Sequence, residues 1–305
     1  MIEATSQPLR MEFEGSFAPL RSDLWGRWLA PLISVAVLLV SVAELRGMDV
    51  RGLTAMLPAS PAFWLVFAGY YLFAPATEWL IFRRLWSLPR RGFLALLRKR
   101  VSNEILLGYS GEIYFYGWAR RNMALTGTPF GAVKDVAILS AAVGNAATLA
   151  LLAVSWPLIG ALRLGMSGEL LAISIGTIAL SSLGALLFRR TLNSVPAAEL
   201  RYITLLHSLR IVVTTVLAAL LWHMVMPGAP LVWWLLLSTL RLLVSRLPFV
   251  PNKDVVFAGI ATFLIGRTAE VSELLTMMAA LTLATHVLLG SALSVGELVG
   301  AERDR

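Results

Sequence analysis

Long runs of apolar residues recur along the chain and dominate its pattern. A helix of about 20 residues crosses the roughly 30 Å hydrocarbon core of a bilayer. The runs that approach this length lie at 28–45, 61–83, 137–158, 169–188, 203–226, 229–245 and 271–292. Backbone groups in lipid must be hydrogen-bonded within the protein, and no strand-like alternation accompanies the runs, so we expect helices. The pattern predicts an all-α polytopic membrane protein with about 7–8 transmembrane helices.

Two further segments, 93–122 and 247–267, are hydrophobic but interrupted. In the first, Gly108 and Gly111 predict a break, and Glu112 begins a second half-helix. Basic residues flank this segment on both sides, so we expect it to be re-entrant, entering and leaving the membrane on the cytosolic side. The second segment repeats the design with Pro248, Pro251 and Gly259. Paired interrupted segments of this kind indicate the substrate site of a transporter.

The composition extends the membrane character to the whole chain. Hydrophobic residues make up 58% and charged residues 14%, whereas soluble domains have about 25% charged residues. The net charge is +8, but the arginines gather at the ends of apolar runs, which indicates membrane topology and anionic headgroups rather than nucleic acid.

The same basic residues predict the orientation of the chain. They are concentrated in the connections 84–136, 189–202 and 246–253, which we therefore assign to the cytosol together with the amino terminus. We expect a cytosolic tail at 1–27, a single transmembrane domain at 28–292 and a short polar tail at 293–305.

Motifs of soluble catalysis are absent from the sequence. It contains no phosphate-binding G-x-x-x-x-G-K-[ST] loop, no G-x-G-x-x-G, no H-E-x-x-H and no G-x-S-x-G. There is no cysteine, and His207, His223 and His286 are far apart, so we expect no metal site. We predict a protein without enzymatic activity and without a cofactor.

Ionisable residues within the apolar runs are the candidates for chemistry, because charge in a membrane is costly. Glu78, His207, Arg210 and Arg241 are all predicted near the cytosolic ends of their helices. We interpret them as lining one hydrated cavity on that side. The alternative is that the long side chains only reach the headgroups. Ser140 and Gly144, four residues apart beside Asn145, are interpreted as packing positions without chemistry.

Glu112 has two candidate roles. If a helix continues across Gly111, Tyr109 and Tyr116 flank the carboxylate on one face, and all three belong to a substrate site. Alternatively, Glu112 caps the second half-helix by accepting hydrogen bonds from its first N–H groups.

Asn103, Gly111 and Glu112, with Arg120 and Arg121 after them, resemble a motif in the membrane domain of lysylphosphatidylglycerol synthases and related flippase-like membrane proteins. Pro248 and Pro251 match a second motif, whereas Asn252, Lys253 and Asp254 stand where that family has glycines. The resemblance implies a protein of the bacterial cytoplasmic membrane that moves or binds a lipid with a polar head. The synthases also carry a soluble aminoacyl-transfer domain, for which we expect no room here.

The leading functional hypothesis is therefore a lipid translocase or lipid-binding transporter with a cavity facing the cytosol. Arg210, Arg241 and Lys253 would bind an anionic headgroup, because the guanidinium group of arginine matches phosphate with two parallel hydrogen bonds. Expected partners are a membrane lipid and an enzyme of lipid synthesis or glycosyl transfer, with no nucleic acid. Two alternatives are a non-catalytic subunit of an envelope assembly and a lipid-modifying enzyme with Glu112 or Asp254 as general base.

Overall fold

The computed structural model describes residues 57–123, 130–161, 195–246, 251–265 and 269–303, together with positions 32, 33, 35–37, 39, 51 and 176. Within these residues the chain is helical and contains no strand. The helices are α3 (Pro61–Trp86), α4 (Gly92–Ile105), α5 (Ser110–Asn122), α6 (Phe130–Ala161), α8 (Ala197–Val225), α9 (Leu231–Ser245), α10 (Lys253–Ile265) and α11 (Ala269–Arg303). The span predicted at 169–188, except position 176, and two thirds of the span predicted at 28–45 lie outside the described residues.

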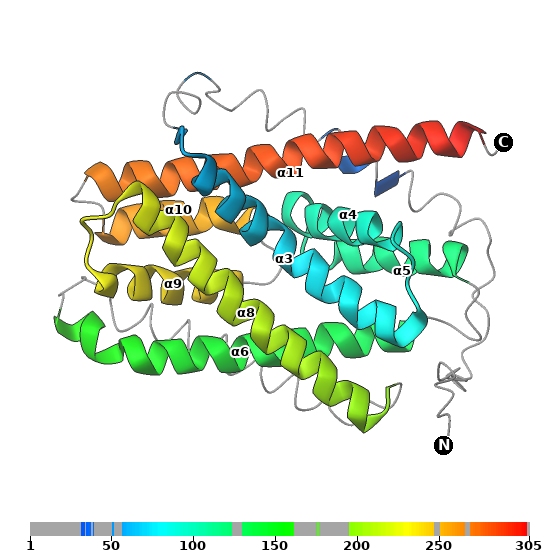
Figure 1. The fold of residues 1–305 in the computed structure, drawn as a ribbon, viewed down its shortest axis with the longest axis horizontal. Helices are drawn as coiled ribbons and strands as arrows, with labels where there is room; N and C mark the ends of the chain where they lie inside the picture. Colours follow the sequence, from blue (N-terminus) through cyan, green and yellow to red (C-terminus); the bar gives the residue numbers. More distant parts are fainter. Residues whose placement is uncertain are drawn as a thin grey trace, which may run out of the picture.

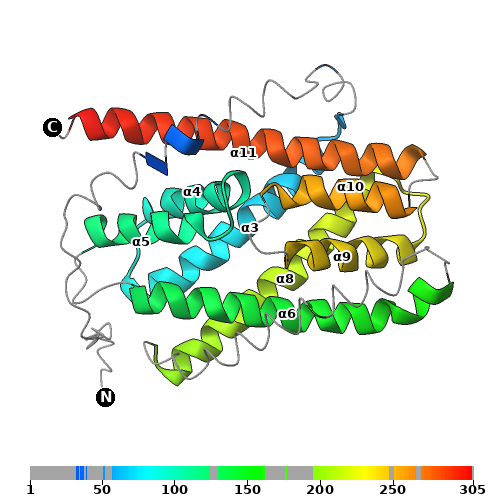
Figure 2. The same cartoon turned by 180° about the vertical axis from the view of Figure 1, so that it is seen from behind.

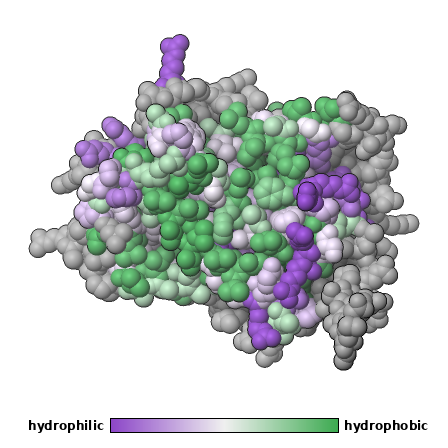
Figure 3. Space-filling model, in the orientation of Figure 1, coloured by the Kyte–Doolittle hydropathy of each residue, from purple (hydrophilic) through white to green (hydrophobic). Residues whose placement is uncertain are grey.

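Four of these helices, α3, α6, α8 and α11, are long and apolar enough to cross a membrane. Their exposed surface is apolar as well, which is the reverse of a soluble bundle. On α8, for example, a stripe of exposed aliphatic side chains repeats every three or four residues, at Leu205, Leu209, Val212, Val216 and Leu220. Figure 3 shows apolar residues gathered over the middle of the face on which α3 and α8 lie. An all-α membrane protein is thus supported by length, composition and surface.

The remaining four helices are short and form two hairpins, α4–α5 and α9–α10 (Figures 1 and 2). The hairpins lie toward opposite ends of the long helices and point toward each other. Their tips meet in the middle of the molecule, where the backbone N–H of Asn252 donates a hydrogen bond to the carbonyl oxygen of Glu104 over 2.6 Å. The two interrupted segments of the sequence therefore contact each other directly.

This arrangement corrects three expectations about the second segment. The run 229–245 was predicted to cross the membrane, but α9 has 15 residues and so rises only roughly 22 Å, less than the thickness of the hydrocarbon core. The connection 246–253 was predicted to be cytosolic, but Asn252 within it is hydrogen-bonded to Glu104 of the α4–α5 hairpin. Gly259 was predicted to interrupt a helix, but α10 continues through it from Lys253 to Ile265.

The first hairpin has its break where the glycines predicted it, between Ile105 and Ser110. Gly111 is required there because a Cβ atom at this position would overlap the carbonyl oxygen of Lys99 on α4. Two hydrogen bonds then hold the arms together: Gly111 N–H donates to Asn103 Oδ1 over 2.7 Å, and Ser110 Oγ donates to the carbonyl oxygen of Ser102 over 2.8 Å. Asn103 thereby caps α5 from the neighbouring helix.

The two largest apolar clusters among the described residues divide the interior along its length. One joins α9, α10 and the start of α11 to Phe63 and Phe67 of α3 and to the end of α8. The other joins α4 and α5 to the end of α3 and the starts of α6 and α8, around Phe82 and Phe115. The polar groups described below lie mainly between these clusters. The last helix, α11, continues to Arg303 through the segment that was expected to be a polar tail.

Candidate functional site: a charged layer between two hairpins

Between the two apolar clusters the helices bring ionisable side chains together, and we refer to these residues as the charged layer. Its members share partial or complete burial and come from both hairpins and from α3 and α8. They are Glu78, Lys99, Arg100, Glu104, Glu112, Arg210, Arg241, Arg246, Lys253 and Asp254.

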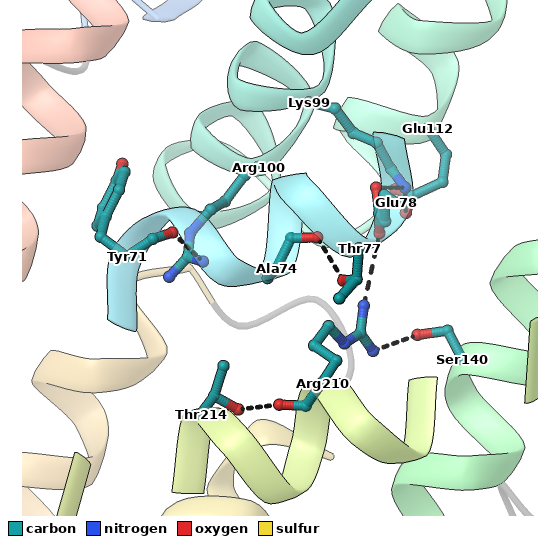
Figure 4. A network of polar contacts seen from close by, with 10 residues as sticks. All are labelled: Tyr71, Ala74, Thr77, Glu78, Lys99, Arg100, Glu112, Ser140, Arg210 and Thr214. Carbon is teal, nitrogen blue, oxygen red and sulfur yellow. Dashed lines mark hydrogen bonds and ion pairs between the residues drawn. The ribbon is translucent and has the colours of Figure 1, made fainter. Parts of the chain in front are cut away.

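The best connected part of the charged layer is centred on Lys99 (Figure 4). Lys99 Nζ lies 2.8 Å from Glu78 Oε2 on α3 and 3.3 Å from Glu112 Oε1 on α5. Glu78 also faces Arg210 of α8, with Oε1 3.5 Å from Nη1, and Arg210 donates a hydrogen bond to Ser140 Oγ of α6 over 2.8 Å. This network joins α3, α4, α5, α6 and α8, so that a hairpin and three long helices share one set of charges.

Lys99 is the cation on which this network depends. Its side chain is only 6% exposed. Burial by itself lowers the pKa of Lys99, but the adjacent carboxylates of Glu78 and Glu112 outweigh burial and raise its pKa, so the ammonium stays charged. Among the described residues, the second oxygen of Glu112, Oε2, is buried and has no hydrogen-bond partner. A buried carboxylate oxygen left without a donor is costly and is available to a ligand or a water molecule.

Arg100, the next residue on α4, replaces a hydrogen bond that is missing from α3. Pro75 lies inside α3 and has no N–H, so the carbonyl oxygen of Tyr71, four residues earlier, loses its helical partner. Arg100 Nη1 donates to this oxygen over 2.9 Å, and its guanidinium group lies over the Tyr71 ring. The Tyr71 hydroxyl in turn pairs with His286 Nδ1 of α11 at 2.8 Å. The proline of α3 and the arginine of α4 therefore form one structural unit.

A second group of charges lies on the side of the α9–α10 hairpin. Arg241 Nε is 3.2 Å from Asp254 Oδ1, and Arg241 also donates to the hydroxyl of Tyr70. A pocket of about 20 Å³ adjoins this pair, and another of about 10 Å³ lies between Glu104, Asp254 and His286. Volumes of this size suit one water molecule each. Burial and the nearby charge of Asp254 raise the pKa of Glu104.

The hairpin tip itself carries two cations, Arg246 and Lys253. Both bind Ser245: the guanidinium donates to Ser245 Oγ from Nε over 3.1 Å and from Nη2 over 2.9 Å, and Lys253 Nζ donates to the Ser245 carbonyl oxygen over 3.2 Å. In the part of the chain that the structure describes, no carboxylate lies within 4.0 Å of either cation.

The predicted site residues thus fall into distinct places. Glu78, Arg210 and Glu112 come together around Lys99, and His207 is buried one turn from Arg210 on α8. Arg241 is not part of that network, because it pairs with Asp254 and Tyr70. Among the described residues, the four ionisable residues of the long runs thus do not share one network of contacts, and the cavity predicted to join them stays a prediction.

The residues around Glu112 also differ from expectation. Tyr109 precedes α5 in a left-handed conformation (φ 73°) and is exposed, so it does not share a helix face with Glu112. Tyr116 packs its ring edge-on against Phe130 of α6. The N–H of Gly111 donates to Asn103 Oδ1 rather than to Glu112, whose Oε2 has no hydrogen-bond partner among the described residues. Asn103 therefore has a structural role in the hairpin.

Three features of the site were not predicted from the sequence: the burial of Lys99, the hydrogen bond of Ser140, and the close approach of the Arg246 guanidinium to Gly144. Lys99 was assigned to a cytosolic connection because it lies in an Arg-Lys-Arg triplet, the usual sign of a cytosolic loop. Ser140 was assigned to packing alone but binds Arg210. The position of the Arg-Lys-Arg triplet could have indicated its burial, because residues 98–100 lie within the helix that leads to the break between α4 and α5.

Comparison of the chain with protein-family models, with curated proteins and with solved structures found no match. The functional reasoning therefore rests on the geometry of the charged layer.

Proposed function

We propose that this protein is an integral membrane lipid translocase or lipid-binding transporter, in which the charged layer receives the polar head of a lipid. We place it in the bacterial cytoplasmic membrane with its amino terminus in the cytosol, and we propose that the two hairpins are re-entrant, one from each side. The observation that carries the proposal is the network around Lys99, which is buried between helices whose outer surfaces are apolar.

The chemistry of the layer supports a polar ligand. Charged groups inside a membrane domain are costly, and they persist where they pair with one another or serve a substrate path. Within the described part of the chain the pairing is incomplete, because Glu112 keeps a buried oxygen without a donor and the cations of the hairpin tip have no carboxylate within 4.0 Å. A lipid that enters between apolar helices keeps its acyl chains in hydrocarbon while its headgroup reaches these groups.

The two hairpins support transport rather than a purely structural role. Broken helices that meet inside a membrane domain are the usual way in which transporters expose backbone groups and charges to a substrate. The ion pairs within the layer change what is expected of its arginines. Arg210 and Arg241 each have a carboxylate partner, so we assign them to support of the layer, with Glu112 as the substrate-facing carboxylate.

The test is Glu112→Gln, which keeps the size of the side chain and removes its charge. Protein reconstituted into vesicles would be assayed for transbilayer exchange of fluorescent analogues of phosphatidylglycerol and phosphatidylethanolamine. We expect at least about tenfold slower exchange, because a neutral amide cannot balance Lys99 or a cationic headgroup as a carboxylate does. Native mass spectrometry of the gently extracted protein would identify the lipid class that is bound.

The matched control is Glu273→Gln, which removes the same charge from an exposed position on α11 and should leave exchange unchanged. Normal exchange by folded Glu112→Gln protein would remove Glu112 from the mechanism. If the wild-type protein exchanges none of the analogues and retains no lipid, the transporter proposal is wrong, and a scaffolding subunit becomes the better account.

A further inference from the structure

The tip of the α9–α10 hairpin holds two like charges together. Arg246 and Lys253 are seven residues apart in sequence, but both bind Ser245, one through its hydroxyl and the other through its carbonyl oxygen. Both side chains are partly buried. No carboxylate among the described residues lies within 4.0 Å of either cation. Among the described residues, the tip therefore concentrates positive charge without a carboxylate in direct contact.

The surroundings of the two cations differ. Arg210, which already shares Glu78 with Lys99, is the largest charged influence on Arg246, whereas the carboxylate of Glu104, not in direct contact, is the largest charged influence on Lys253. Burial, followed by the charge of Arg210, lowers the pKa of Arg246 to about 10, and burial likewise lowers the pKa of Lys253. With a pKa of about 10, the guanidinium of Arg246 keeps its proton at neutral pH. Like charges in a partly desolvated place repel strongly unless an anion lies between or beside them.

The guanidinium group of Arg246 packs against α6 at Gly144. Gly144 faces Arg246, and a Cβ atom at residue 144 would overlap the guanidinium. The rest of α6 near this point is ordinary helix, so the missing side chain leaves room for the arginine head. This contact fixes Arg246 beside Ser245 and presents it together with Lys253 at the place where the two hairpins meet.

We propose that Arg246 and Lys253 form a phosphate-binding site at the tip of the second hairpin. The guanidinium, whose Nε and Nη2 each donate to Ser245 Oγ, supplies its remaining N–H groups to phosphate oxygens, and the ammonium supplies a point charge beside them. This inference rests on the proposed function in one respect. If the protein handles lipids, the bound phosphate belongs to a lipid headgroup; the same two side chains would also bind free phosphate. It assigns the anion site to residues other than the paired arginines Arg210 and Arg241.

The experiment measures ligand-induced thermal stabilisation of the purified full-length protein in a neutral detergent. The probes are inorganic phosphate, a short-chain phosphatidic acid and a short-chain phosphatidylcholine, and each is titrated to give a dissociation constant. Two variants address the site by different means. Arg246→Gln removes the charge, while Gly144→Ala keeps every charge and displaces only the guanidinium.

We expect the short-chain phosphatidic acid to bind the wild-type protein and to bind both variants at least about tenfold more weakly, since a charge-assisted pair of hydrogen bonds is lost. Two controls should bind like the wild type. Gly259→Ala adds a methyl group on α10 where nothing lies within 4 Å, and Arg90→Gln removes an exposed arginine.

Each outcome decides something. Binding of phosphatidic acid without binding of inorganic phosphate identifies a lipid headgroup, and equal binding of both identifies a free-phosphate site. Unchanged binding by Gly144→Ala and Arg246→Gln, or no binding by the wild type, overturns the site while leaving lipid exchange to stand on its own assay. Loss of binding in the variants with no lipid exchange by the wild type retains the site and rejects the transporter.

Discussion

At the scale of single residues, we expect substitution of Lys99 to affect stability strongly, because its ammonium group pairs with two carboxylates from different helices. Its replacement by methionine would leave Glu78 with Arg210 at 3.5 Å and Glu112 without an ion-pair partner among the described residues. Breaking a buried ion pair from one side typically destabilises a protein by about 3–5 kcal/mol. We therefore expect Lys99→Met to lower the thermal unfolding temperature of the detergent-purified protein markedly.

A double variant provides the control for this prediction. Combining Lys99→Met with Glu112→Gln removes a cation and an anion together, and we expect it to be more stable than Lys99→Met alone, since the uncompensated carboxylate is gone. Additive effects of the two substitutions would mean that the two side chains do not interact.

The residues that could be predicted from the sequence are those whose chemistry is conspicuous in a hydrophobic run. Glu78 and Arg210 stand out there because charge in a membrane helix is costly, and the structure pairs them. Lys99 and Arg246 could not be found in this way. Each lies beside other basic residues or at the end of a run, where the positive-inside pattern already explains it. Burial of such a residue depends on tertiary contacts that its local sequence does not contain.

At the scale of elements, the α4–α5 hairpin depends on the absence of a side chain at residue 111. Gly111→Ala places a methyl group against the carbonyl oxygen of Lys99 and against Asn103 Oδ1. The backbone of α4 cannot rotate away as a flexible side chain would, so the two arms must separate. Overpacking of this kind costs about 1–3 kcal/mol, and we expect a lower unfolding temperature together with weakened contact between Lys99 and Glu112.

Gly69→Ala is the matched substitution for this experiment. It lies on α3, where a new Cβ atom would meet Leu217 at an ordinary distance of 3.8 Å, so stability should be maintained or slightly increased. Equal stability of the two glycine variants would show that the arms of the hairpin are not as closely packed as described.

The helical elements were predictable to different degrees. Apolar runs of more than 20 residues indicate α3, α6, α8 and α11 without ambiguity, and the glycines at 108 and 111 locate the break of the first hairpin. The run before Arg246 was predicted to be a complete transmembrane span. The hydrophobic pattern of such a run is the same whether the helix ends at a membrane surface or in the protein interior.

At the scale of the whole molecule, the hairpins meet through a contact between Glu104 and Asn252, which are far apart in the chain. No local pattern specifies such a contact. The described structure nevertheless separates two ends of the molecule clearly, with the α3–α4 turn at one end and the α8–α9 turn at the other (Figures 1 and 2).

The ends of the molecule can be located by cysteine labelling, because the chain has no native cysteine. We expect an impermeant thiol reagent to label Arg90→Cys only from the cytosolic side and Gly228→Cys only from the opposite side. Pro251→Cys should react more slowly than either, because the adjacent residue Asn252 is hydrogen-bonded to Glu104 of the α4–α5 hairpin. Fast cytosolic labelling at position 251 would restore a surface turn there and refute the inward hairpin.

The bond between Arg100 and the carbonyl oxygen of Tyr71 has a consequence for biosynthesis. Synthesis runs from the amino terminus, so α3 is complete before residue 100 has left the ribosome. Until then, the carbonyl group opposite Pro75 has no partner from α4, and an unsatisfied carbonyl in hydrocarbon costs several kcal/mol. Helix α3 therefore reaches its final stability in the bilayer only when α4 has folded against it.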